Sequence, residues 1–75
     1  MQQKINEILS NILEIEVRED SYLTMENCPQ WTSLTHIDIV MSIEEEFGIA
    51  FDERTLFKLT SQQMIIEKVA ELLNA

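Results

Sequence analysis

The chain has 75 residues, of which 45% are hydrophobic, so it has room for one modest core but not for a buried cleft between subdomains. We therefore expect a single domain over residues 1–75 that is not an enzyme. The single glycine and single proline favour helices over turns or disorder. A formal net charge of −9 repels phosphate backbones and anionic lipid, which argues against nucleic acid and membranes as partners.

Other compositional features indicate a soluble, cytoplasmic protein. Cys28 is the only cysteine, which rules out an internal disulfide and fits a reducing compartment. No apolar run approaches the roughly 20 residues that span a bilayer. The first residues, MQQKINEIL, lack the basic and then apolar segments of a signal peptide. We expect a monomer without membrane insertion.

The acidic residues are unevenly placed along the chain. Residues 19–53 contain nine acids and no Lys or Arg, whereas the rest of the chain balances five acids against five bases. Such a segment attracts basic patches on other proteins. The alternative is that the acids only keep a small domain soluble.

The first predicted element is an amphipathic helix over residues 3–15. Its apolar residues recur at the i, i+3, i+4, i+7 and i+8 spacing of one helix face: Ile5, Ile8, Leu9, Ile12 and Leu13. Residues 16–31 follow without periodicity, and Pro29 disfavours helix at the residue before it. A connection of this length is expected to be functional or to wrap the core. Its expected anchors are Tyr22, Leu23 and Trp31.

The second predicted helix begins at Thr32 or Ser33 and ends at Gly48. Hydroxyl side chains cap helix starts, and glycine suits the left-handed conformation found at helix ends. Asp52 is then a candidate cap for a short third helix that holds Leu56 and Leu59.

A last helix is predicted to open at Thr60, which with Gln63 has the T-x-x-Q spacing of a capping box. Its buried face is expected to consist of Ile65, Ile66, Val69, Leu72 and Leu73. The predicted fold class is therefore all-α. We expect a small, antiparallel-like four-helix bundle with three main helices, a short third helix and a long loop between helices 1 and 2.

The second helix carries apolar residues on two faces, because each residue turns a helix by about 100°. One stripe contains no acid and is expected to face the core: Ile39, Val40, Ile43 and Phe47. The other lies roughly opposite and has acids at its edges: Leu34, Ile37 and Met41, with Asp38, Glu44 and Glu45. An apolar strip with an acidic rim is typical of a docking surface. The alternative is that the third helix and the long loop cover this strip.

Three acids, Glu44, Glu45 and Glu46, stand at the C-terminal end of this helix. The helix dipole is negative there, so each exposed acid costs about 0.3–1 kcal/mol at low salt. Stability alone would favour Lys or Arg at these positions. The three acids therefore also indicate a basic partner.

Ser33 stands where the same helix starts. Unpaired N–H groups and the positive end of the helix dipole stabilise an anion at such a position. A phosphodiester on the Ser33 oxygen would be favourably placed there. Because esterification weakens a serine as a cap, we expect the preceding Thr32 to cap the helix.

The segment TSLTHIDIVMSIEEEFGIAF resembles the modification site and second helix of the acyl carrier proteins. The family pattern is Asp-Ser-Leu followed by an apolar, acidic helix that ends in Glu-Glu-Glu-Phe. The similarity covers nearly the whole chain, from the opening helix to LTSQQMIIEKVAELL. Trp31 and His36 form a Trp-x-Ser-Leu-x-His arrangement that resembles discrete carriers of specialised pathways more than the carrier of fatty acid synthesis.

The resemblance implies a carrier that holds acyl intermediates as thioesters on a 4'-phosphopantetheine arm attached to Ser33. The implied partners are a phosphopantetheinyl transferase and acyl-loading and acyl-transfer enzymes with basic docking patches, in a specialised lipid, polyketide or glycan-modifying pathway. In the family, the bundle interior or the groove beside helices 2 and 3 shelters the acyl chain. The family's docking positions fall at Leu34, Ile37, Asp38, Met41, Glu44 and Glu45.

Thr32 departs from the family pattern, which has Asp before the serine. The change removes a charge beside the attachment point, so we expect slower recognition by the transferase or a need for a dedicated one. Two alternatives stay open. One is an aminoacyl or peptidyl carrier, and the other is an unmodified acidic adaptor that lost the arm because of Thr32.

Other chemistry has weak support in the sequence. Ser33, His36 and Asp38 all lie within two turns of one helix, which does not give the convergent geometry of a hydrolytic triad. We expect His36 at the helix edge or against a partner. Cys28 and His36 are too few for a structural zinc site, and FDERTLFKL lacks the ligand pattern of a calcium loop.

Overall fold

The computed structural model describes residues 1–74, and apart from one isolated β-bridge the secondary structure of this part of the chain is helical. The four helices are α1 (Gln2–Leu13), α2 (Ser33–Phe47), α3 (Glu53–Leu56) and α4 (Gln62–Leu73). The predicted all-α fold class, with a short third helix and a long loop between helices 1 and 2, is confirmed. No helix within residues 1–74 has the length and apolarity needed to cross a membrane.

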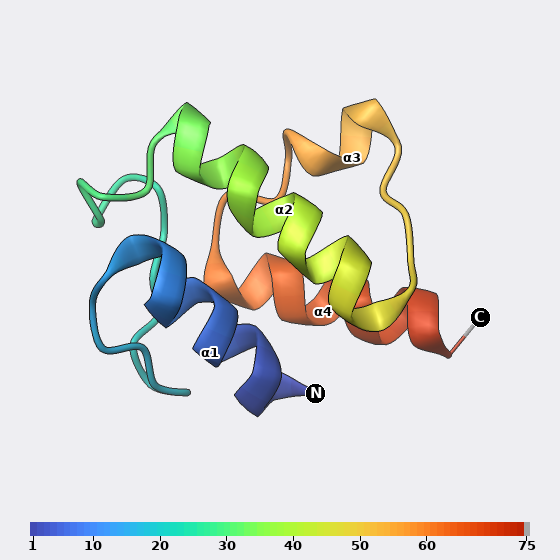
Figure 1. The fold of residues 1–75 in the computed structure, drawn as a ribbon, viewed down its shortest axis with the longest axis horizontal. Helices are drawn as coiled ribbons and strands as arrows, with labels where there is room; N and C mark the ends of the chain where they lie inside the picture. Colours follow the sequence, from blue (N-terminus) through green and yellow to red (C-terminus); the bar gives the residue numbers. More distant parts are fainter. Residues whose placement is uncertain (75) are drawn as a thin grey trace.

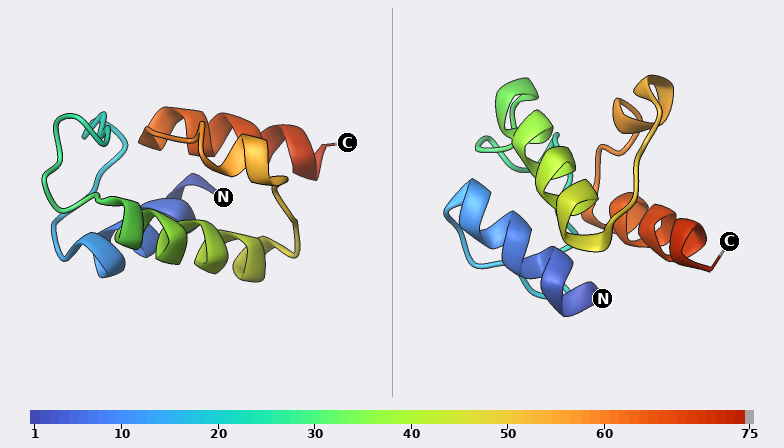
Figure 2. Two further views of the ribbon diagram at one scale, coloured as in Figure 1. Left: turned by 90° about the horizontal axis from the view of Figure 1, so that it is seen from above. Right: turned by 45° about the vertical axis from the view of Figure 1, so that its right-hand side comes forward.

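The three long helices do not simply alternate in direction. α1 and α2 lie side by side and antiparallel, and α3 lies on the opposite side of α2 from α1 (Figure 1). α4 runs in the same direction as α2, as both views of Figure 2 show. The expected antiparallel-like order is therefore wrong for α4, because the segment 48–61, which contains α3, carries the chain back along the bundle before α4 begins.

The core lies where α1, α2 and α4 meet. The largest fully buried side chains come from all three helices: Ile5, Leu9, Leu13, Ile39, Ile43, Ile65 and Val69. Val40 is buried as well, and Ile8, Ile12 and Phe47 are partly buried against the core, so the predicted core faces of α1 and α2 are confirmed. Leu73, predicted to be buried, is 46% exposed, because the last turn of α4 extends beyond the end of α2 (Figure 1).

The start of α3 agrees with the sequence prediction. Asp52 is its N-cap, and the carboxylate accepts a hydrogen bond from the Thr55 backbone N–H at 2.7 Å. This bond lowers the pKa of Asp52 from its ordinary value of 3.8. Leu59, expected within the third helix, lies after it but is buried in the core.

The start of α4 differs from the prediction by one residue. Ser61 is the N-cap, accepting a hydrogen bond from Met64 N–H at 3.1 Å, so the predicted Thr60–Gln63 capping box is wrong. Thr60 pairs instead with the first loop, because its carbonyl accepts from Met25 N–H at 3.0 Å. Thr24 and Ser61 form an isolated antiparallel bridge beside it. This pairing keeps the backbone extended at Ser61, where φ is −148° and ψ is 157°. The first helical residue of α4 is therefore Gln62.

The long loop between α1 and α2 is held mainly by one buried glutamine. Gln62 Nε2 donates to Asn6 Oδ1 at 2.9 Å and to the Arg18 carbonyl at 2.8 Å, and its Oε1 accepts from Leu23 N–H at 3.1 Å. Trp31 is buried as predicted. Tyr22, expected to be an anchor, is 69% exposed, because backbone hydrogen bonds of its neighbours fix the loop there instead.

Replacing Gln62 therefore tests whether this network stabilises the fold. In Gln62→Ala three hydrogen bonds are lost from a buried site, and we expect the free energy of unfolding to fall by about 2–3 kcal/mol. Urea unfolding followed by circular dichroism measures the change. Gln63→Ala is the matched control, because Gln63 is exposed and, among residues 1–74, its side chain bonds only to Glu67, so its effect should stay within about 0.5 kcal/mol. Equal effects of the two substitutions would contradict the anchoring role.

Candidate functional site

A reciprocal pair of threonine hydrogen bonds fixes the start of α2. Thr32 is the N-cap, and its Oγ1 accepts from Thr35 N–H at 3.3 Å, while Thr35 Oγ1 accepts from Thr32 N–H at 2.8 Å. The Thr35 hydroxyl also donates to the Gln30 carbonyl at 2.9 Å, which ties the end of the long loop to the helix. The expected capping role of Thr32 is confirmed. Its partner was missed, because capping boxes usually have Glu or Gln at that position.

Ser33 is the first residue of α2 and is exposed. Within residues 1–74 its hydroxyl forms no hydrogen bond, and the backbone N–H groups of Ser33 and Leu34 are likewise without a backbone partner. The first turn of α2 contains no acidic residue. A negatively charged group on the Ser33 oxygen would therefore meet helix N–H groups and no carboxylate of the same turn, and it would disturb no hydrogen bond of this part of the chain.

The second apolar stripe of α2 faces solvent. Leu34 is 81% exposed, Met41 61% and Ile37 38%, and we term these three residues the apolar ridge. The alternative in which the third helix and the long loop cover them is wrong. The Leu56 carbonyl of α3 is hydrogen-bonded instead to His36. His36 lies on a different face of α2 from the ridge.

The predicted rim acids of the ridge do not all occupy the same environment. Asp38 and Glu45 are exposed, and within residues 1–74 neither forms an ion pair. Glu44 is partly buried, and its Oε2 accepts a hydrogen bond from Phe51 N–H at 2.7 Å. Asp38 and Glu45 thus flank the ridge as expected, whereas Glu44 holds the segment that leads to α3.

The third acid at the end of α2 also has an intramolecular contact. Glu46 lies on the α1 side, with its Oε1 3.7 Å from Lys4 Nζ. Fold-related contacts therefore account for Glu44 and Glu46 without any partner. Of the acidic run, only Glu45 is left to support the inference of a basic partner.

Trp31 and His36 form a buried pair beside Ser33. The indole Nε1–H of Trp31 donates to His36 Nδ1 at 3.0 Å, and His36 Nε2 lies 2.7 Å from the Leu56 carbonyl. The expectation that His36 lies at the helix edge or against a partner is wrong, because its side chain is almost fully buried. With both ring nitrogens engaged, His36 forms no hydrogen bond with Ser33, and the three residues Ser33, His36 and Asp38 make no triad.

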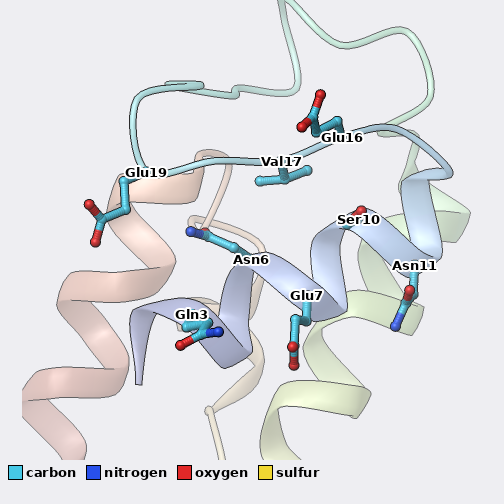
Figure 3. A pocket seen from close by; sticks show the side chains of 8 residues that line it. All are labelled: Gln3, Asn6, Glu7, Ser10, Asn11, Glu16, Val17 and Glu19. Carbon is cyan, nitrogen blue, oxygen red and sulfur yellow. The ribbon is translucent and has the colours of Figure 1, made fainter.

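Two surface pockets lie away from the predicted site. One, of about 670 Å³, lies between α1 and the loop after it, and Glu7, Glu16 and Glu19 are among its largely polar lining residues (Figure 3). The other, of about 540 Å³, lies between the long loop and the start of α4 and includes Met25 and Met64. Neither is lined by α2 or α3, so shelter of an acyl chain beside these helices stays a prediction.

No protein-family model matches this chain, and no curated protein matches its sequence. The resemblance to acyl carrier proteins therefore stays a prediction from the residues themselves. In the part of the chain that the structure describes, no group of three or more His, Cys, Asp or Glu side chains could hold a metal ion.

The capping role of Thr32 can be measured apart from any function. Thr32→Val removes the hydroxyl at almost constant shape, and we expect the free energy of unfolding to fall by about 1 kcal/mol in urea unfolding experiments. Thr32→Ser keeps the acceptor and should stay close to the wild type. If Thr32→Ser is as unstable as Thr32→Val, the hydroxyl is not the stabilising group.

Proposed function

We propose that this protein is a carrier on which Ser33 bears a 4'-phosphopantetheine arm, whose terminal thiol holds acyl groups as thioesters for delivery to partner enzymes. One observation carries the proposal. Ser33 presents an exposed hydroxyl without a hydrogen bond in the described chain, at the first position of a 15-residue helix whose cap is supplied by Thr32. Modification therefore leaves the hydrogen bonds that begin α2 intact.

The electrostatic setting of Ser33 supports an anionic attachment. The phosphodiester carries a negative charge, and the N-terminal end of a helix stabilises such a charge through its unpaired N–H groups and its dipole. Thr32 stands where acyl carrier proteins have Asp, so the anion on Ser33 has one fewer carboxylate beside it. In the attachment reaction the Ser33 oxygen loses its proton to a base and attacks the pantetheine-bearing phosphorus of coenzyme A. The pyrophosphate P–O bond breaks, 3',5'-adenosine bisphosphate leaves with that electron pair, and the phosphodiester to Ser33 forms. Because His36 is fully engaged, the transferase must supply the base.

The apolar ridge beside Ser33 supports a docking role in the same carrier function. Leu34 and Met41 expose most of their side chains, and together with Ile37 they lie on one face of α2. Apolar groups at the centre of an interface supply burial, and the surrounding charges supply orientation and encounter rate. Asp38 and Glu45 provide negative charge at this position. We therefore propose that basic partner enzymes, including the transferase, dock on the ridge.

Intact-mass measurement tests the attachment site. After incubation with coenzyme A and a broad-specificity phosphopantetheinyl transferase, the wild type should gain the mass of one phosphopantetheine. Ser33→Ala should gain nothing. Ser42→Ala, which removes another serine of α2, is the matched control and should be modified like the wild type.

An unchanged wild-type mass, under conditions that modify a control carrier, would contradict the carrier function and favour the unmodified adaptor. A mass gain that persists in Ser33→Ala would place the arm elsewhere. Loading assays with acyl and aminoacyl donors on the modified protein then separate an acyl carrier from an aminoacyl or peptidyl carrier.

Charge reversal tests the docking surface. In the double variant Asp38→Lys, Glu45→Lys we expect the KM of the transferase for this protein to rise about tenfold at low salt. The rise should be smaller at 0.5 M salt, because screening weakens the attraction between exposed charges. Glu19→Lys, Asp20→Lys makes the same change of net charge on the first loop and is the matched control. Equal effects of the two double variants would show that only net charge matters.

A further inference from the structure

The larger of the two surface pockets has no part in the proposed carrier function. Its volume is about 670 Å³, and it lies between α1 and the segment that follows this helix (Figure 3). Three of its lining residues are acidic, Glu7, Glu16 and Glu19, and none is Lys or Arg. A concave site lined by charge of one sign attracts a ligand of the opposite sign, here a cation.

Asn6 lines the same pocket, although only 7% of this residue is exposed. The orientation of its amide is fixed through Gln62. The Leu23 backbone N–H can only donate, so Gln62 turns Oε1 toward Leu23 and Nε2 toward Asn6. Asn6 therefore presents Oδ1 to Gln62, at 2.9 Å, and its Nδ2 points elsewhere.

The Nδ2 group of Asn6 has no hydrogen-bond partner in the part of the chain that the structure describes. Among residues 1–74, every fully enclosed side-chain nitrogen or oxygen does have a partner, so this Nδ2 is accessible from outside. Figure 3 shows it between α1 and the following segment, at the end of the pocket where Glu19 also lies. A bare cation cannot accept from an N–H donor, so a ligand that uses this group needs an acceptor oxygen as well.

The three carboxylates of the pocket are not equally free. Glu7 lies 3.5 Å from the Lys4 ammonium, and Glu16 lies 2.9 Å from the Arg18 guanidinium. Both pairs are exposed, and exposed pairs are weak enough for a cation of a ligand to replace the intramolecular partner. Glu19 forms no ion pair within residues 1–74, so it is the carboxylate that a cation meets without competition.

We propose that this pocket binds an extended, arginine-containing segment of a partner protein. A guanidinium of the segment pairs with Glu19, because its planar N–H groups match a carboxylate, and a backbone carbonyl accepts from Asn6 Nδ2. Val17, which also lines the pocket, has a backbone N–H and C=O without a backbone partner in the described chain, and an extended peptide can pair with such groups. This inference goes beyond the carrier function and does not require an arm on Ser33.

A defined arginine peptide tests the site. The probe is acetyl-Gly-Arg-Gly-Arg-Gly-amide, whose blocked ends carry no charge, titrated at neutral pH and low salt into the 75-residue chain and followed by NMR. We expect the side-chain NH₂ signals of Asn6 and the backbone N–H signal of Val17 to shift along one binding curve. The same peptide with Gln in place of both Arg residues should bind about tenfold more weakly. A wild type that does not bind the probe, or that binds it with shifts confined to α2, would overturn the proposal.

Glu19→Gln tests the carboxylate at almost constant shape. We expect the dissociation constant of the probe to rise about threefold to fivefold. Asp20→Asn is the matched control, because it makes the same change of net charge at an exposed neighbour that does not line the pocket, and it should bind like the wild type. Equal effects of the two substitutions would show that only net charge matters and would contradict the site.

Asn6→Asp separates the donor from the charge. The new carboxylate still accepts from Gln62 Nε2, but the free N–H donor is lost while a negative charge is added. We expect binding about fivefold weaker than in the wild type. Attraction to charge alone predicts the opposite, tighter binding, and that result would refute the role of the donor.

If Asn6→Asp fails to fold, spermidine on the wild type makes the same distinction. Its protonated amines have no acceptor, so the side-chain NH₂ signals of Asn6 should stay close to their free positions. Shifts as large as those caused by the peptide would overturn the proposal. Ser33→Ala, which cannot carry an arm, should bind the probe like the wild type, so the outcome is independent of the carrier function.

Discussion

The burial of one face of α2 against α1 and α4 fixes the rotation of that helix, and the other features of the site depend on it. Ile39 and Ile43 are fully buried. Because each residue turns the helix by about 100°, the direction in which every other α2 side chain points is then determined as well. This rotation turns His36 and Glu44 toward α3 and its connection, and Glu46 toward α1. The apolar ridge and its two exposed acids are then left to solvent. A small rotation of α2 would disturb all these contacts together.

Periodicity was enough to predict the four helices and the two faces of α2, because both follow from local spacing. The helix starts were predicted where the cap is a single side chain close in sequence, as with Asp52 and Thr32. The prediction at Thr60 was wrong because a backbone contact with Met25, far away in the chain, decides where α4 begins. Local patterns carry no information about such a contact.

The buried polar residues show the same limit more strongly. Gln62 bonds to groups 39, 44 and 56 residues away, and nothing in its neighbourhood distinguishes it from the exposed Gln63. The role of His36 was missed for a related reason, since its two partners come from the loop before α2 and from α3. The position of Ser33 was predictable because the start of a helix determines both its exposure and the N–H groups beside it.

The charges of the protein also separate into two groups once the contacts are known. Glu46 forms an ion pair with Lys4, and Glu44 accepts a hydrogen bond from Phe51 N–H, so both acids contribute to the fold. The exposed ion pair adds at most about 1 kcal/mol to the free energy of unfolding. Asp38 and Glu45 have no such contact within residues 1–74, and both lie beside exposed apolar side chains. Neither folding nor capping accounts for this pairing of carboxylates with the ridge. We propose that attraction of a basic surface to Asp38 and Glu45 accounts for it, because the charges would orient a partner whose contact area is the ridge itself.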